Sequence, residues 1–234
     1  MRTVGLLGGM TFEATAIYYN VINRHVRSKL GGRRSAPLFL YSADQEVMLQ
    51  HATKGDWTAF AKVFISAGNA LKGGGAEGLA ICASLAHKVA DEVESQVGLP
   101  VLHVADFTAK GILAKGLKRV ALLGTAVVME GEFMKGRIEQ KFGIDVLVPG
   151  SEERARINQG IVSELTTGKV SPETKAFFIQ TIKDLCDRGA QGLILGSTDL
   201  GFLIKQEDVD IPLFDTALLH AQGVAEWVVG TDKP

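Results

Sequence analysis

An internal repeat constrains the fold of this 234-residue chain more than any other feature. The segment GAEGLAICAS at residues 75–84 is echoed by GAQGLILGST at residues 189–198. Each copy is followed by an apolar segment that contains a proline, residues 99–102 and residues 211–214. Two similar halves of this kind predict a ligand site between them.

The repeat extends upstream and supplies an internal register. Residues 4–9 (VGLLGG) match residues 120–125 (VALLGT), so each half opens with a strand. In this register Ala83 is the counterpart of Ser197, eight residues after the glycine that opens each copy.

The composition is that of a soluble globular protein, and its charge balance favours a small-molecule partner. Hydrophobic residues make up 46% and charged residues 22%, and the formal net charge is −1. Nucleic acids and anionic membranes favour a strongly basic face, so neither is expected as a partner. No apolar run approaches the roughly 18 residues of a membrane span. Cys82 and Cys186 show no metal-ligand spacing, which predicts a cytoplasmic location and no metal site.

Short apolar runs bounded by Gly or Pro alternate with helical patterns. Because the runs show no polar alternation, they predict parallel strands buried on both faces. The expected class is α/β, with two pseudosymmetric three-layer αβα domains and a ligand cleft between them. The domains are expected at residues 1–105 plus 216–234 and at residues 106–215. The predicted strands are residues 3–7, 37–41, 78–82, 100–104, 119–123, 144–148, 192–195 and 211–214, and the predicted helices include residues 12–30, 57–71, 174–187 and 216–229.

Four small polar loops follow the predicted strands. In open parallel sheets the ligand lies beyond the carboxyl ends of the strands, where backbone N–H groups and hydroxyls could hold a carboxylate or phosphate. Thr11 and Ser84 could equally serve only as helix caps. The loops are Gly8-Gly9-Met10-Thr11, Ala83-Ser84-Leu85, Gly124-Thr125 and Ser197-Thr198-Asp199.

Several motifs together resemble the aspartate/glutamate racemase family nearly end to end. The resemblance implies a cofactor-independent isomerase, usually a homodimer, that binds an amino acid or dicarboxylate between two α/β domains. The motifs are GLLGGMTFEAT at residues 5–15, Cys82 with HKVAD at residues 87–91, VALLGT at residues 120–125, RINQ at residues 156–159 and LGSTD at residues 195–199.

The chain departs from the family at both expected bases. Racemisation without a cofactor needs one group to remove the Cα proton and a second, on the opposite face, to return one. The family places Cys or Thr at the position of Ala83 and Cys at the position of Ser197. Ser84 and Leu85 also replace an amide and a hydroxyl that the family uses on the substrate carboxylate. Weak or lost racemase activity is therefore expected.

Other residues could take over part of this chemistry. His87 and His103 are possible substitute bases. The alternatives are that His87 is bonded to the backbone and that His103 is a satisfied histidine at a strand end. Cys82 is expected to face the core, because it lies one residue before position 83 and neighbouring side chains of a strand point to opposite faces. Arg156 could pair with a carboxylate, or be a solvated charge. The predicted substrate-binding residues are Gly9, Met10, Thr11, Ser84, Leu85, Thr125, Arg156, Thr198 and Asp199.

Three functions follow from these residues. The first is a racemase-like isomerase of acidic amino acids. The second is a catalytically inactive binding protein, which the pair Ala83 and Ser197 favours. The third is a one-base decarboxylase or isomerase of small carboxylic acids.

Overall fold

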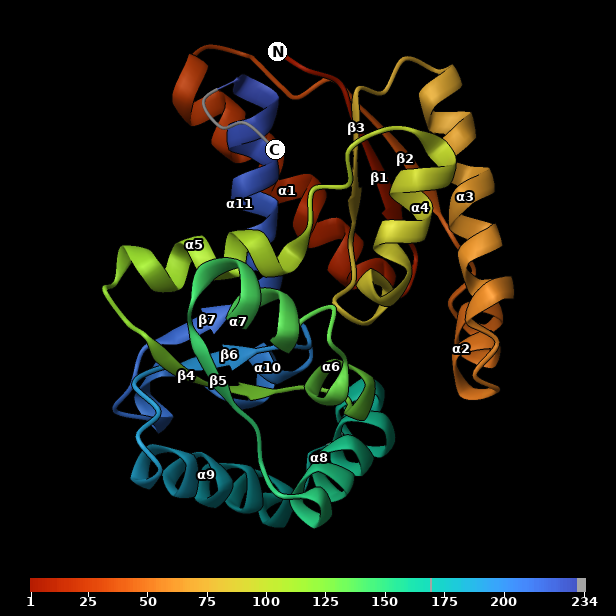
Figure 1. Cartoon of the computed structure of the whole chain (residues 1–234). Helices are drawn as coiled ribbons and strands as arrows, with labels where there is room; N and C mark the ends of the chain where they lie inside the picture. The colour runs from red at the N-terminus through yellow and green to blue at the C-terminus, as the bar shows by residue number, and fades with distance from the viewer. Residues whose placement is uncertain (169, 231–234) are drawn as a thin grey trace. The chain divides into compact units, whose positions relative to one another are not determined.

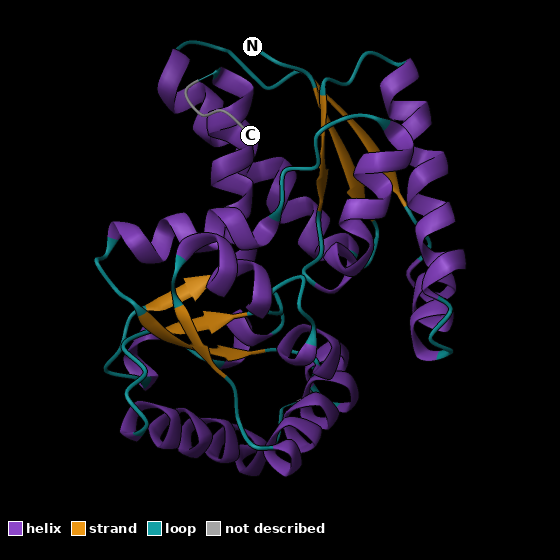
Figure 2. Ribbon diagram, in the orientation of Figure 1, coloured by secondary structure: helices purple, strands orange, loops and turns teal. Residues whose placement is uncertain are grey.

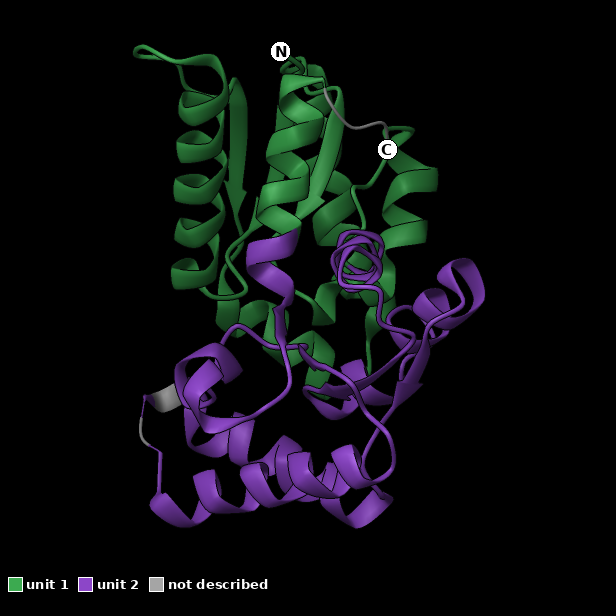
Figure 3. Cartoon of the chain, turned by 90° about the vertical axis from the view of Figure 1, so that its left-hand side faces the viewer, with its two compact units in different colours: residues 1–104, 220–234 green, residues 105–219 purple. Residues whose placement is uncertain are grey.

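The computed structural model describes residues 1–168 and 170–230 (Figure 1). The chain divides into two compact units, coloured separately in Figure 3. Unit 1 consists of Met1–Val104 and His220–Pro234, and unit 2 of Ala105–Leu219. The divisions predicted from the sequence lie after residue 105 and before residue 216.

Unit 1 is built on a parallel three-stranded sheet with the order β2-β1-β3. Its two faces are covered by different helices. A Cβ on Gly5 of β1 would contact Leu71 of α3, whereas a Cβ on Gly78 of β3 would lie 2.8 Å from the ring of Trp227 in α11. The elements are β1 (Val4–Gly8), α1 (Phe12–Leu30), β2 (Leu38–Ser42), α2 (Gln45–Thr53), α3 (Trp57–Gly73), β3 (Gly78–Ile81), the 3-10 helix η1 (Leu85–Val89), α4 (Ala90–Val97) and most of α11 (Thr216–Val229).

Unit 2 is built on a parallel four-stranded sheet with the order β5-β4-β6-β7 (Figure 2). Apolar residues of α8 and α9 pack against β4 and β6 in a single buried cluster. The elements are α5 (Val104–Ala114), β4 (Arg119–Leu123), α6 (Ala126–Glu130), α7 (Lys135–Phe142), β5 (Asp145–Leu147), α8 (Ser151–Ser163), η2 (Leu165–Thr167), α9 (Pro172–Asp187), β6 (Leu193–Leu195), α10 (Leu200–Leu203), η3 (Gln206–Asp208) and β7 (Leu213–Asp215). Both units thus have the predicted α/β class with parallel strands.

The repeat reappears as matched backbone hydrogen bonds in the two units. The N–H of Leu79 donates to the carbonyl of Pro100, and the N–H of Leu193 to that of Pro212, both at 2.9 Å. At the carboxyl end of the strands, Cys82 N–H donates to Leu7 at 2.9 Å and Gly196 N–H to Leu123 at 2.7 Å. Residues 82 and 196 therefore occupy equivalent places, which makes Ala83 and Ser197 counterparts in the fold.

Two of the predicted strands differ from expectation. Residues 100–104 form only an isolated bridge, between Leu79 and Val101, because α5 begins at Val104. The strand expected at residues 37–41 was predicted to be buried on both faces, and this was wrong. It forms β2, an edge strand that pairs with β1 alone, and Phe39, Leu40 and Tyr41 are all exposed. In the described residues no helix combines the length and the apolar character needed to span a membrane.

Candidate functional site

The loop after β1 is held by Gly9 and Thr15. Gly9 has a φ of +92°, and a Cβ there would collide with the backbone of Ala43. Its N–H donates to Thr15 Oγ1 at 3.0 Å. The hydroxyl of Thr11 caps α1 by accepting from Ala14 N–H at 3.2 Å, and the Met10 side chain is buried in the core. Of these predicted binding residues, Thr11 has the capping role and Met10 can present only its backbone to a ligand.

The loop after β3 carries no ionisable side chain at the position of the first family base. Ala83 is half-buried and, like Leu85, packs against the core of unit 1. Ser84 is at the N-cap position of η1. Cys82 is buried as predicted, and burial raises the pKa of its thiol far above the usual range, so no thiolate is available there.

His87 is buried beneath this loop and is bonded to the backbone through both ring nitrogens. Nε2 accepts a hydrogen bond from Val104 N–H at 3.2 Å, so the proton must be on Nδ1, which donates to the carbonyl of Ala83 at 2.9 Å. The rings of His103 and His220 pack edge-on against it. These contacts favour the backbone-bonded alternative for His87 over the substitute base.

In unit 2 the loop after β4 contains a buried hydroxyl that lacks a partner. Thr125 precedes α6, and its Oγ1 has no hydrogen-bond partner among the described residues. The next residue is anchored from α8, where Asn158 Oδ1 accepts from Ala126 N–H at 2.9 Å. A buried hydroxyl without a partner is unfavourable by about 1–3 kcal/mol, so the group is suited to a polar ligand.

The loop after β6 adjoins the Thr125 loop. Strands β4 and β6 are neighbours, with Leu123 opposite Leu195, so their carboxyl ends meet at one edge of the sheet. In this loop Ser197 Oγ donates to Asp199 Oδ2 at 3.0 Å. Ser197, Thr198 and Asp199 are all half-buried. The sequence had placed Thr125 and these three residues in one site, and the fold of unit 2 brings their loops together.

Arg156 is not part of this edge. Two residues along a helix turn by about 200°, so Arg156 and Asn158 point to opposite sides of α8. The Arg156 side chain is 53% exposed; it pairs with Glu173 at 3.3 Å and stacks over the ring of Phe177. These contacts favour the alternative in which Arg156 is a solvated surface charge over the expected pairing with a ligand carboxylate. Asn158, from the same RINQ motif, is not among the predicted site residues. An amide on the buried side of this helix was the sequence signal for its role.

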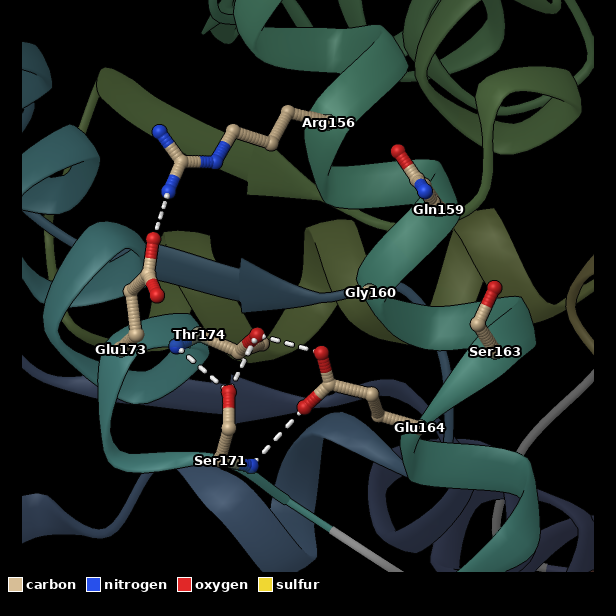
Figure 4. Close-up of a pocket in the computed structure, with 8 residues that line it drawn as sticks. All are labelled: Arg156, Gln159, Gly160, Ser163, Glu164, Ser171, Glu173 and Thr174. Atoms are coloured by element: carbon tan, nitrogen blue, oxygen red, sulfur yellow. Dashed lines mark hydrogen bonds and ion pairs between the residues drawn. The ribbon is translucent and has the colours of Figure 1, made fainter.

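Arg156 instead lines an open pocket of about 230 Å³ between α8 and the start of α9 (Figure 4). Several of the polar groups there bond to one another. Glu164 accepts from Thr174 Oγ1 at 2.6 Å and from Ser171 N–H at 2.8 Å, and Thr174 N–H donates to Ser171 Oγ. The hydrogen bond from Thr174 lowers the pKa of Glu164. This network caps α9. The polar groups that form it are therefore satisfied without a ligand.

Asp215 is a further carboxylate at the same sheet edge and is not among the predicted site residues. It ends β7 opposite Leu195, and its Oδ1 accepts from the N–H groups of Ala217 and Leu218 at the start of α11. Burial raises the pKa of Asp215, and the two N–H donors offset part of that effect. Its signal in the sequence was an acidic residue immediately after a strand and before a helix.

The comparisons with known proteins agree with this fold. The model of the Asp/Glu/Hydantoin racemase family matches residues 7–224. A putative Asp/Glu racemase from Yersinia pestis is similar, with 40% identity and a TM-score of 0.92 over 98% of this chain and 100% of that one. An aspartate racemase homologue from Pyrococcus horikoshii is 33% identical, with a TM-score of 0.82 over 98% and 100% of the two chains. The aspartate racemase of Picrophilus torridus shares the fold, at 18% identity and a TM-score of 0.69, with both chains fully covered. The chain belongs to the Asp/Glu/Hydantoin racemase family.

Proposed function

We propose that the chain binds a small acidic amino acid or dicarboxylate and is a cofactor-independent, racemase-like isomerase whose two-base turnover is weak or lost. Family membership supports the substrate class. The loss of turnover is supported by Ala83 and Ser197, which stand where the resemblance places the two family bases. A methyl group has neither an acidic proton nor a basic lone pair, and a serine hydroxyl is a far weaker acid than a thiol.

The observation that carries the binding proposal is the buried Thr125 hydroxyl, which has no partner among the described residues. A ligand carboxylate placed beyond β4 would accept from this hydroxyl. Asn158 fixes the adjoining backbone at Ala126. Thr198 and Asp199, on the neighbouring loop, would contact the rest of the ligand.

Replacement of Thr125 by valine tests this role of the hydroxyl. Valine keeps the shape and removes only the hydroxyl, so we expect aspartate or glutamate to bind about tenfold more weakly, or about 1.4 kcal/mol. The free energy of unfolding should stay equal or rise, because an unpaired buried group is lost. Thr58→Val, on the exposed first turn of α3, is the matched control. Unchanged affinity in Thr125→Val, measured by titration calorimetry, would contradict the proposal.

Two alternatives have their own support. An inactive binding homologue is favoured by the absence of an ionisable group at Ala83. A one-base decarboxylase or isomerase is favoured by the hydrogen bond between Ser197 and Asp199, which places one carboxylate in the loop. Binding of aspartate without any change at Cα supports the first alternative, and consumption of a dicarboxylic acid supports the second.

We also propose a homodimer in the cytoplasm. The dimer is supported by the exposed apolar side chains of β2 and α2, Phe39, Leu40, Tyr41, Val47 and Leu49. An edge strand with such side chains is suited to pairing with its own copy across a twofold axis. The cytoplasmic location is supported by Cys82 and Cys186, both of which are free thiols in the structure.

A further inference from the structure

The hydrogen-bonded pair Ser197–Asp199 offers a proton-transfer group different from the thiols expected at these positions. Ser197 Oγ donates to Asp199 Oδ2 at 3.0 Å, so the serine proton is already committed to the carboxylate. In such a pair the group able to accept a further proton is the carboxylate, not the hydroxyl. Both residues are half-buried in the loop that follows β6.

The counterpart loop in unit 1 supplies nothing equivalent. The matched bonds Cys82–Leu7 and Gly196–Leu123 place Ala83 in the position of Ser197. The residue two positions beyond Ala83 is Leu85, where unit 2 has Asp199. His87 holds the Ala83 carbonyl and accepts from Val104, so its ring nitrogens are committed to the backbone. The two loops therefore differ: the loop of unit 2 carries a carboxylate, and the equivalent positions of unit 1 carry apolar side chains.

From this arrangement we infer a one-sided reaction that rests on the proposed function: Asp199, oriented by Ser197, removes and returns the Cα proton of a bound carboxylic acid on a single face. The Cα–H bond breaks, its electron pair is delocalised into the adjacent carboxyl or carbonyl group, and the proton passes to Asp199. The same carboxyl then returns a proton to the same face. After exchange of the Asp199 proton with solvent, the product is the starting enantiomer with a solvent hydrogen at Cα.

The strength of the base limits the substrates that react well. In model peptides the pKa of an aspartic acid is about 3.9 and that of a cysteine thiol about 8.5. A carboxylate is thus a weaker base than a thiolate, so it suits a carbon acid that is more acidic than a free amino acid. A cyclic ureide such as hydantoin-5-acetate has its C–H next to a neutral carbonyl and keeps one carboxylate for the Thr125 hydroxyl. We expect it to exchange faster than aspartate.

The test is proton NMR in deuterium oxide combined with chiral chromatography of the same samples. The probes are the separate enantiomers of aspartate, glutamate and hydantoin-5-acetate, each with a protein-free control. We expect the Cα signal of one enantiomer to disappear while the other enantiomer does not form beyond the protein-free rate. Asp199→Asn should slow exchange at least 100-fold, within the range for general acid–base catalysis. Ser197→Ala should slow it about tenfold, because the carboxylate remains but loses its orienting partner.

Two further variants complete the test. Asp210→Asn, at an exposed carboxylate of the same unit, is the matched control and should exchange at the unmodified rate. Asp199→Glu keeps the carboxylate and should recover part of the exchange lost in Asp199→Asn. Inversion that accompanies exchange, or full exchange in Asp199→Asn, would overturn the inference.

Ligand binding, measured on the same samples by saturation transfer, separates the two proposals. Binding without any exchange overturns the one-sided reaction and leaves the proposed binding function in place. No binding of any probe overturns the proposed function itself.

Discussion

The imidazole of His87 ties two segments of unit 1 together: Nδ1 donates to the carbonyl of Ala83 at 2.9 Å, and Nε2 accepts from Val104 at 3.2 Å. The ring is buried and lies beside His103 and His220. His220 is bonded in turn to Tyr18 and to the carbonyl of Leu102. These contacts give the loop after β3 a fixed backbone, and they assign His87 a structural role.

His87→Ala should therefore destabilise the protein. The substitution removes the partners of a buried N–H and a buried carbonyl and leaves a cavity, so we expect a loss of about 3 kcal/mol in the free energy of unfolding. Urea denaturation measures this loss. His51→Ala, on the half-buried last turn of α2, is the control and should change stability by about 0.5 kcal/mol or less. Unchanged stability in His87→Ala would argue against the structural role.

Asp106 should make the free energy of unfolding depend on pH in the acidic range. Burial alone raises the pKa of Asp106, but hydrogen bonds and charges from Arg137 and Lys141 outweigh that effect and lower it. The Arg137 pair is bidentate, at 2.6 and 3.0 Å. A lowered carboxyl pKa adds stability that is complete above the ordinary value near 4 and is lost as the pH falls through the folded-state value.

Asp106→Asn should thus lower the free energy of unfolding by about 1–2 kcal/mol at pH 7. The difference from the unmodified protein should start to shrink below about pH 4, where Asp106 is protonated in the unfolded state, and should vanish once the pH falls below the lowered folded-state pKa. Denaturation curves between pH 3 and 7 measure both effects. A difference that is constant across this range would show that the charge of Asp106 does not contribute.

Leu40 of β2 should be needed for the proposed dimer. It is 45% exposed on the edge strand, and a charge there would be buried without a partner in a β2–β2 interface. Leu40→Lys should convert the dimer to a monomer in sedimentation velocity experiments. Leu113 of α5, which is 46% exposed, offers the matched control Leu113→Lys, whose oligomeric state should not change. A dimer that persists in Leu40→Lys would exclude this edge as the interface.

Thiols at positions 83 and 197 should restore inversion at Cα if the missing bases are the sole cause of lost racemase activity. Ala83→Cys combined with Ser197→Cys supplies one thiol in each half, at positions that the matched backbone bonds make equivalent. We expect conversion of L-aspartate to D-aspartate, measured by chiral chromatography, in the double variant and not in either single variant. Binding without conversion would mean that Ser84 and Leu85 also prevent correct orientation of the substrate.

Much of the fold could be predicted from local patterns. Runs of apolar residues without polar alternation indicate parallel strands, and Gly75 and Gly189, with φ of +102° and +94°, end equivalent helices. The exposure of β2 could not be predicted in this way, because it depends on having a single neighbour in the sheet. The strand predicted at residues 100–104 is likewise reduced to the bridge between Leu79 and Val101, and α5 begins at Val104.

The sequence by itself determined the α/β class, the repeat and the equivalence of Ala83 and Ser197, because apolar periodicity, glycine stops and repeated segments are local features of the chain. Only the tertiary structure decided that Arg156 pairs with Glu173 at the surface, that His87 is bonded to backbone and that Thr125 has a buried hydroxyl without a partner among the described residues. The physical reason is that periodicity reports which face of an element is buried. The partners of a polar group are set by segments far apart in the chain, and these meet only when the sheet and its helices have packed.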